Sequence, residues 1–369
     1  MARIAHFVGS LPPELAADDR AALQWFLDRC TGAAVGAIPR DLDTDWILDY
    51  LRARAKHADT LELIRPGAFA DYNDFPTFRV RRGRRLRPEH VAMDRADRID
   101  EVVVAYGKLR AENTAALGVR LQISQPNPLD MTMFVFASAA VSSGLPTLPA
   151  LRHAASVVDA VRMLPVFVDA VLGEMAAVSA RHHHIVWQIE TPIAMLAMVK
   201  AAQFHADRLL APLLARQLAA LLTRTHNADL ETVLHLCYGD YQHRSLLTPR
   251  SLAPAVRLLN ATARRLRRRA IPLPPVHIPC GYGAEPAPLT PEFYHPLGAL
   301  DSAWRVIAGV VSPETDTSAH ALALFEDALD RPAHGVATAC GFGRCTVETA
   351  EKAAAATLAT AVTRTPPCA

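Results

Sequence analysis

Three residues at the ends of two apolar segments carry side chains that can bind a metal ion. His235 and Cys237 lie two residues apart at the end of the apolar run Thr232–Leu236, and Cys340 follows a second apolar run. Because alternate residues of a β-strand share one face, the imidazole and the first thiol can point to one place. A later strand that brings Cys340 to the same rim would supply a third donor. Three nitrogen and sulfur ligands with one open position are typical of a catalytic zinc site.

The expected chemistry follows from the softness of these ligands. Zinc lowers the pKa of a bound thiol from about 8.5 and holds the group as a nucleophilic thiolate. Two thiolate ligands also make the metal a weak Lewis acid, better suited to presenting a thiolate than to activating water. The pattern therefore favours transfer of an alkyl group to or from sulfur.

Composition limits the other classes of function. The chain has 369 residues, 51% of them hydrophobic, and its net charge of +2 gives no general attraction to nucleic acid or membranes. Its most apolar stretch, Met131–Leu145, is too short and too interrupted by serine to span a bilayer. Six cysteines, without a signal-peptide core in the first residues, indicate reduced thiols and a cytoplasmic location. An oligomer is possible, but the sequence does not specify one.

Strand-length apolar runs alternate with longer segments of helical period. This alternation indicates βαβ units, and eight such strands in a chain of this length favour a single (β/α)₈ barrel over residues 1–369. An open, doubly wound sheet is the alternative, but Gly9–Pro13, after the first strand, is not a glycine-rich phosphate turn. The basic segment 77–87, between the second and third helices, predicts an inserted β-hairpin. The expected strands are Ile4–Gly9, Ala33–Ile38, Val119–Ser124, Ile185–Glu190, Val233–Cys237, Val276–Cys280, Arg305–Val310 and Val336–Cys340.

A barrel of this kind carries its chemistry at the carboxyl ends of the strands. The triplet His182–His184 precedes a strand and is expected at the opposite face, and Arg264–Arg269 closes a helix, where cations suit the dipole and water. The basic hairpin is expected to be a solvated arm, with binding of an anionic substrate tail as the alternative. The residues expected at the catalytic end are Ser10, Arg40, Gln125, Glu190, His235, Cys237, Cys280 and Cys340.

At these strand ends the chain resembles the carboxyl-terminal barrel of cobalamin-independent methionine synthase and its stand-alone relatives. The resemblance runs nearly end to end, and it is specific because its motifs occur in order, each at a strand end. The motifs are Phe7–Pro12 (FVGSLP), Gln122–Pro128 (QISQPNP), Gln188–Pro192 (QIETP), His235–Cys237 (HLC) and Cys340–Arg344 (CGFGR).

The resemblance implies roles for individual residues. It implies that Ser10 and Glu190 bind the amino acid group of homocysteine, with Glu190 contacting the amine. Glu190 is also the expected catalytic residue. Gln125, in the third-strand motif, is a further expected substrate contact. Zinc is the implied cofactor, and its implied ligands are His235, Cys237 and Cys340.

Three departures from the family pattern matter. In place of the family's glutamate ligand the chain has Val276–Cys280, so Cys280 is a weaker ligand candidate, Glu285 is another, and the position can also be open. The family's presumed proton donor, a histidine after the seventh strand, is missing from Gly309–Pro313. Glu190 replaces an aspartate, and its extra methylene shifts the carboxylate by about 1.5 Å.

The sequence thus predicts a zinc-dependent enzyme that transfers a methyl or other alkyl group to or from a small thiol such as homocysteine. Its expected partners are the thiol and an alkyl donor, whose identities stay open. The alternatives on the same barrel are a thiol–epoxide alkyltransferase of the coenzyme M type and a carbon–sulfur lyase. A non-catalytic binding protein descended from the enzyme is a third. A uroporphyrinogen decarboxylase-type barrel is disfavoured, because it needs no metal and leaves the three ligands unexplained.

Overall fold

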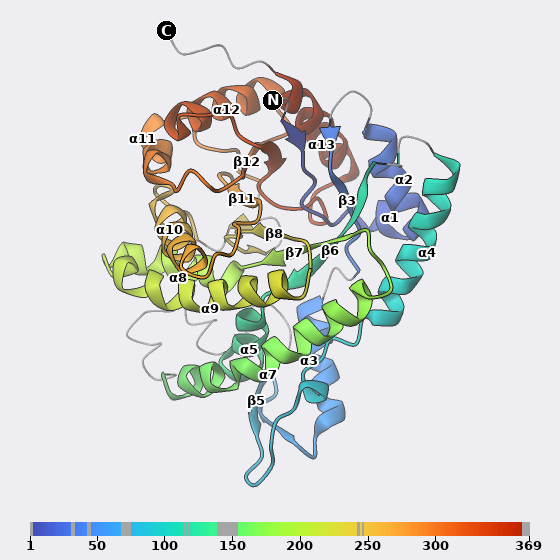
Figure 1. Ribbon diagram of the computed structural model, residues 1–369, viewed down its shortest axis with the longest axis vertical. Coiled ribbons are helices and arrows are strands. Elements are labelled where there is room, and N and C mark those ends of the chain that lie inside the picture. Colours follow the sequence, from blue (N-terminus) through green and yellow to red (C-terminus); the bar gives the residue numbers. More distant parts are fainter. Residues whose placement is uncertain are drawn as a thin grey trace.

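A computed structural model of the chain describes most of the sequence. Figure 1 shows a ring of strands surrounded by helices, with a smaller layer of helices and two antiparallel strands to one side. Within this described part, no helix combines the length and hydropathy needed to cross a membrane. The described residues are 3–30, 34–42, 46–67, 75–113, 116, 118–138, 154–241, 244–245, 247–282 and 284–363.

The described residues form a nine-stranded parallel sheet in the order β2-β1-β13-β12-β11-β8-β7-β6-β3. The two end segments, β2 and β3, are consecutive in the chain and are separated only by Gly36. Because β2 pairs with β1 and β3 pairs with β6, this interrupted strand closes the sheet into a nearly complete barrel. The predicted barrel is confirmed, with the predicted strand Ala33–Ile38 divided in two. The segments are β1 (Ile4–Ala5), β2 (Ala34–Val35), β3 (Ala37–Pro39), β6 (Arg120–Pro126), β7 (Ile185–Glu190), β8 (Thr232–His235), β11 (Val276–Pro279), β12 (Val306–Val311) and β13 (Gly335–Thr338).

Helices cover the outside of the ring, where outward-facing apolar strand residues form the main core with them (Figure 1). Side-chain caps begin several described helices: Asp18 accepts a hydrogen bond from the Ala21 N–H before α2, Asn127 accepts one from the Leu129 N–H before α5, and Thr346 accepts one from the Thr349 N–H before α13. The described α-helices are α1 (Pro13–Ala16), α2 (Asp19–Arg29), α3 (Trp46–Ala53), α4 (Ala96–Glu112), α5 (Pro128–Phe136), α7 (Ala154–Ser179), α8 (Pro192–Gln203), α9 (Asp207–Asn227), α10 (Ala253–Arg267), α11 (Pro291–Tyr294), α12 (Thr315–Leu329) and α13 (Val347–Val362). The described part of the chain also contains the short 3₁₀ helices η1 (Arg54–His57), η2 (Pro88–His90) and η5 (His295–Ala299).

The inside of the barrel changes from apolar to polar along the strands. An apolar cluster fills the interior and is separate from the main core; its buried members are Val8, Val186, Val233, Ile307 and Ala337. Because strand side chains alternate between faces, the next inward position after Val186 is Gln188 and the one after Val233 is His235. The barrel therefore presents buried polar groups directly above an apolar floor.

The inserted antiparallel pair differs from the hairpin predicted for residues 77–87. Strand β5 (Thr77–Val80) pairs antiparallel with β4 (Leu61–Arg65), which precedes it in the chain. Residues 81–87 form a turn and irregular backbone instead of a returning strand. The prediction was wrong about the partner because the turn around Gly83 (φ 76°) ends the pairing, while the apolar residues of β4 supply the opposing strand.

Candidate metal centre

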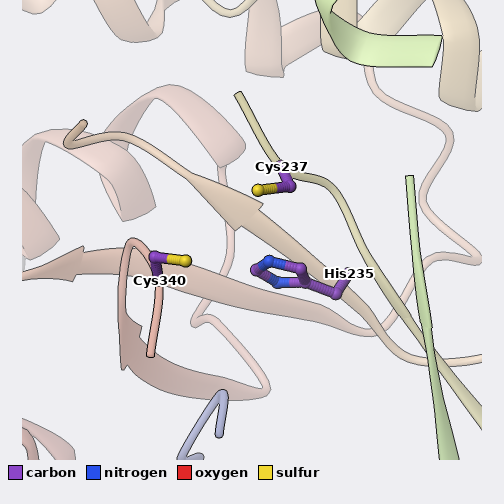
Figure 2. Close-up of side chains that lie close together, drawn as sticks. All are labelled: His235, Cys237 and Cys340. Carbon is purple, nitrogen blue, oxygen red and sulfur yellow. The ribbon is translucent and has the colours of Figure 1, made fainter. Parts of the chain in front are cut away.

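Three predicted ligands meet at the carboxyl end of the barrel. His235 is the last residue of β8, Cys237 lies two residues beyond it, and Cys340 lies two residues beyond β13. Their donor atoms lie within 4.8 Å of one another. Strands β11 and β12 separate β8 from β13, so closure of the barrel brings Cys340 to the other two. Figure 2 shows both sulfur atoms directed into the space beside the His235 ring.

The backbone fixes both cysteines locally. The Gly239 N–H donates a hydrogen bond to Sγ of Cys237 (3.3 Å), and the glycine has the positive φ of 71° that this tight turn requires. The carbonyl of Cys340 accepts a hydrogen bond from Oγ1 of Thr338 (2.7 Å). Each thiol thus lies on a short, hydrogen-bonded turn directly after its strand.

The loop that carries Cys340 packs against the loop that follows β1. Oγ of Ser10 accepts a hydrogen bond from the Gly343 N–H (3.0 Å). A Cβ on Gly341 would overlap the Gly9 carbonyl and Oγ of Ser10, so this close approach requires glycine. The structure therefore brings Ser10 to the same rim as Cys340, and the glycines of the CGFGR motif make the contact possible.

The two thiols differ in acidity. Cys237 and Cys340 are not joined by a disulfide. Hydrogen bonds with Cys237 and with His235 hold the pKa of the Cys340 thiol well below its usual range. The same pairing, together with burial, raises the pKa of Cys237. The pair thus favours one thiolate at Cys340, which suits the binding of a soft divalent cation.

His235 is oriented by a second buried histidine. Its Nδ1 lies 2.7 Å from Nδ1 of His277, its register partner on β11, and the two rings stack with centroids 4.8 Å apart. His235 is 1% exposed and His277 is fully buried. Burial, and then the charges of His235 and His6, lower the pKa of His277 well below its usual range. Because Nδ1 of His235 is occupied, Nε2 is the ring nitrogen left for a metal.

Glu190 lies at the same level of the barrel, as the register partner of His235 on β7. Its Oε1 accepts hydrogen bonds from Oγ of Ser124 (2.9 Å) and from Nε2 of Gln188 (3.4 Å). Gln188 is itself held by the Val8 carbonyl (2.7 Å). The carboxylate is only partly buried. The arrangement fixes one oxygen of Glu190 and leaves the other to accept a hydrogen bond from a bound molecule.

Two predicted site residues are not brought to this group. Gln125 is buried on the helix side of β6, where Arg95 donates to its Oε1 and also pairs with Glu174 (2.8 Å). Cys280 follows β11 and is fully buried, and its Sγ is directed to the Ile278 carbonyl (3.7 Å). Inward-facing and outward-facing residues alternate along a strand, and both Gln125 and Cys280 fall on the outward face.

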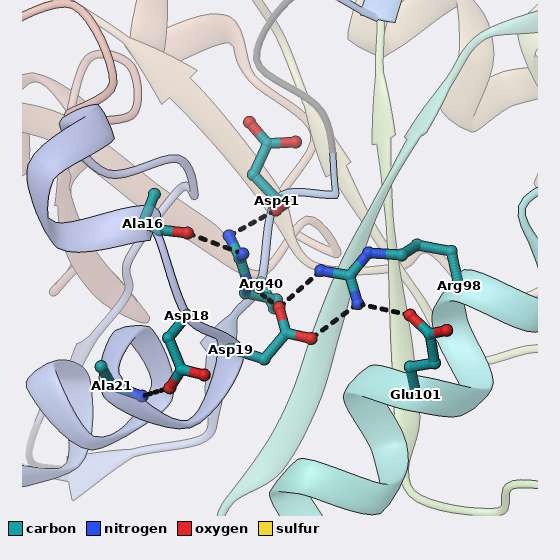
Figure 3. A network of polar contacts seen from close by, with 8 residues as sticks. All are labelled: Ala16, Asp18, Asp19, Ala21, Arg40, Asp41, Arg98 and Glu101. Atoms are coloured by element: carbon teal, nitrogen blue, oxygen red, sulfur yellow. Dashed lines mark hydrogen bonds and ion pairs between the residues drawn. The ribbon is translucent and has the colours of Figure 1, made fainter.

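Arg40, another predicted strand-end residue, belongs to an ion network (Figure 3). Its Nε donates to Asp19 (2.7 Å), and its two other guanidinium nitrogens donate to the carbonyls of Asp41 (2.7 Å) and Ala16 (3.0 Å). Arg98 also pairs with Asp19 (2.6 Å) and joins α4 to α2. The guanidinium of Arg40 is therefore engaged in holding helices to the barrel rim.

Sequence reasoning missed the inward-facing partners Ser124, Gln188 and His277. A signal for them was present, because polar and apolar residues alternate in each strand. Ser124 stands beside Gln125 but shares a face with Gln122, and His277 lies on the face opposite Cys280. Applying the two-residue period within each strand would have selected these three side chains.

No protein-family model and no curated protein sequence matches the chain. Among solved structures, the fold is similar to a B12-independent methionine synthase from Shewanella sp. W3-18-1, solved in complex with selenomethionine. The TM-score is 0.52 and the sequence identity 12%, over 98% of this chain and 97% of that chain. At this identity the likeness shows a common fold. The chain is thus a mixed α/β barrel whose fold a B12-independent methionine synthase shares.

Proposed function

We propose that the chain is a zinc-dependent enzyme that transfers a methyl or other alkyl group to or from a small thiol of the homocysteine type. The observation that carries the proposal is the convergence of one imidazole and two thiols, from His235, Cys237 and Cys340. They lie at the end of the barrel where such folds place their catalytic residues. The fold shared with a methionine synthase supports methyl transfer.

The donor set fits zinc. Imidazole nitrogen and thiolate sulfur are ligands of Zn²⁺ and are disfavoured by the oxygen-seeking Mg²⁺ and Ca²⁺. Among the described residues, no fourth His, Cys, Asp or Glu joins the group, which leaves a position for substrate sulfur. Bound there, zinc would stabilise the substrate thiol as a thiolate at neutral pH.

The residues around the group can orient an amino acid. The free oxygen of Glu190 can accept a hydrogen bond from a substrate ammonium, while Ser124 and Gln188 keep the carboxylate in place. Oγ of Ser10 accepts from Gly343, so its hydroxyl proton remains available to a substrate carboxylate. Glu190 and Ser10 would thus hold the two ends of an amino acid group whose sulfur points to the thiol pair.

The substrate class follows from these contacts. A homocysteine-like thiol has the ammonium, carboxylate and sulfur that the three parts of the site recognise. The selenomethionine in the Shewanella enzyme is an amino acid with a methylated selenium atom, which is the kind of product expected here. The thiol chemistry requires reduced cysteines and so fits a cytoplasmic location.

The first experiment measures zinc stoichiometry and affinity in the wild type, Cys340→Ser and Cys345→Ser. Loss of one thiolate ligand should weaken binding by several kcal/mol, because a full site of this kind binds with roughly 10–16 kcal/mol. Cys345→Ser is the matched control, since Sγ of Cys345 hydrogen-bonds the Phe342 carbonyl (3.1 Å) and lies outside the ligand group. Unchanged zinc affinity in Cys340→Ser would reject the proposed centre.

The second experiment identifies the thiol. The cobalt-substituted protein is titrated with homocysteine and, separately, with mercaptoethanesulfonate, and the sulfur-to-cobalt charge-transfer absorption is followed. A new thiolate ligand should raise this absorption, and homocysteine should bind more tightly because only it carries the ammonium that Glu190 can accept. Preference for the sulfonate would favour the thiol–epoxide alternative. Binding of zinc with no response to either thiol would favour a non-catalytic protein.

A further inference from the structure

His277 is a costly residue to bury. It lies inside the barrel with no exposure, and its Nε2 makes no hydrogen bond of good geometry among the described residues, although the backbone of Thr338 acts on the ring. An unpaired polar atom in the interior destabilises the folded state, whereas an apolar residue of similar volume would not. Because the sequence nevertheless has an imidazole here, its role lies with Nδ1, which faces Nδ1 of His235 at 2.7 Å.

The neighbouring strand makes room for the imidazole. Gly309 on β12 is the register partner of Pro279, and a Cβ at that position would be 2.5 Å from Nε2 of the His277 ring. Any larger residue at 309 would push the ring from its stacked position over His235. Glycine at 309 and the stacked pair therefore fix the plane of His277, and through it the plane of His235.

We propose that His277 is a positioning residue that aims the metal ligand His235. In a neutral His235 whose Nε2 binds a metal, the proton is on Nδ1, and Nδ1 of His277 accepts it as a hydrogen bond. This bond fixes the tautomer of His235 and turns Nε2 toward Cys237 and Cys340. The inference rests on the zinc centre proposed above.

The choice of an imidazole acceptor has a physical consequence. Metal-bound histidines usually donate their second N–H to a carboxylate, a carbonyl or water. Here two thiolates already balance the charge of a divalent ion, and a carboxylate beneath them would add an uncompensated buried negative charge. A neutral imidazole supplies the hydrogen bond without that charge.

The test compares zinc affinity and the cobalt d–d spectrum in the wild type, His277→Leu, His277→Asn and His6→Leu. His277→Leu should bind zinc 10- to 100-fold more weakly, the usual effect of losing such a partner. His277→Asn should restore affinity and spectrum, because its amide oxygen occupies the place of Nδ1. His6 is the control: it is also buried, its ring centroid is 6.1 Å from that of His277, and its loss should leave zinc affinity unchanged.

The outcomes separate the two proposals. Wild-type zinc affinity in His277→Leu would overturn the positioning role and leave the zinc centre standing. Equal weakening in the leucine and asparagine variants would show that packing, and not the hydrogen bond, matters, and would also overturn it. A wild-type protein that binds no zinc would overturn the proposed function and this inference with it.

Discussion

Two polar clusters lie at the carboxyl end of the barrel, and they differ in how many of their side-chain donors and acceptors have hydrogen-bond partners. Around Arg40, every guanidinium nitrogen has an acceptor, and the carboxylate of Asp19 is shared with Arg98 (Figure 3). Around His235, two thiols converge on the imidazole ring (Figure 2), and Nε2 of the partner ring of His277 makes no hydrogen bond of good geometry among the described residues. Among the residues that the structure describes, the first cluster has all of its partners and the second does not.

The difference separates a structural cluster from a functional one. A buried ion network with all partners present holds elements together, and removing one member leaves a charge without its partner. A group of soft donors that converge without a common partner contributes little to folding and is arranged to bind something else. Variants of the two clusters should therefore affect different properties of the protein.

The largest effect is expected from Asp19→Asn. This change leaves Arg40 and Arg98 without their shared carboxylate, and breaking such a largely buried pair should destabilise the fold by about 3 kcal/mol. Denaturant unfolding measures the loss, and zinc affinity should stay unchanged. Asp28→Asn, at an exposed site on the same helix, should change stability by less than about 0.5 kcal/mol.

Cys237→Ser should show the opposite pattern to Asp19→Asn, with weaker zinc binding and nearly unchanged stability of the metal-free protein. Zinc binding should weaken by about 3 kcal/mol, roughly a quarter of the free energy of a full site, because one of its ligands is lost. Metal-free stability should change little, since the thiol makes one weak hydrogen bond, with Gly239, and one with Cys340. Calorimetric titration and unfolding of the metal-free protein check both parts. A large loss of metal-free stability would remove the distinction between the clusters.

Gly341→Ala should affect both properties. The added methyl group overlaps the Gly9 carbonyl and Ser10, so the Cys340 loop must shift, at a cost of about 1–3 kcal/mol in stability. The shift should also weaken zinc binding. Gly173→Ala is the matched control, since its Cβ would meet nothing within 4 Å on helix α7, and it should be neutral or stabilising. Unchanged stability in Gly341→Ala would contradict the close approach of the two loops.

Lowering the pH should have a smaller effect on the stability of the fold. Hydrogen bonds from Arg98, and then from Arg40, lower the pKa of Asp19 below its ordinary value, despite partial burial. A lowered folded-state pKa means that the stability is fully present above the unfolded-state value near 3.9 and is lost as pH falls through the folded-state value. The wild type should lose stability below about pH 4, with a steeper slope than Asp19→Asn. Parallel slopes in unfolding measured from pH 5 to 2 would contradict this linkage.

The smallest effect should come from Ser124→Ala. Loss of the hydrogen bond to Glu190 should weaken binding of an amino acid thiol by about 1 kcal/mol, because the carboxylate is held less firmly. Zinc affinity should not change. A thiol without an amino group is the control ligand, and its affinity should be the same in both proteins. Equal loss for both thiols would show that Ser124 does not act through Glu190.

Much of the site could be predicted from the chain because its signals are local. Cys340 is marked by its position just beyond a strand end, where the backbone bends after Thr338. The His-x-Cys spacing depends only on the two-residue period. The same period would have excluded Gln125 and Cys280, but strand-end position alone does not tell which face a residue occupies. The partner of β5 was harder to predict, because two strands pair according to their packing surroundings as well as their own sequence.

The sequence by itself determined the barrel and the identity of the three soft donors, since hydrophobic period and residue chemistry are properties of short segments. Only the tertiary structure decided that His235 pairs with His277, that Ser10 contacts the Cys340 loop, and that Arg40 is engaged by Asp19. These contacts join residues distant in the chain, and their geometry depends on how the barrel closes. Closure sets the register of all the strands together, which no single segment specifies.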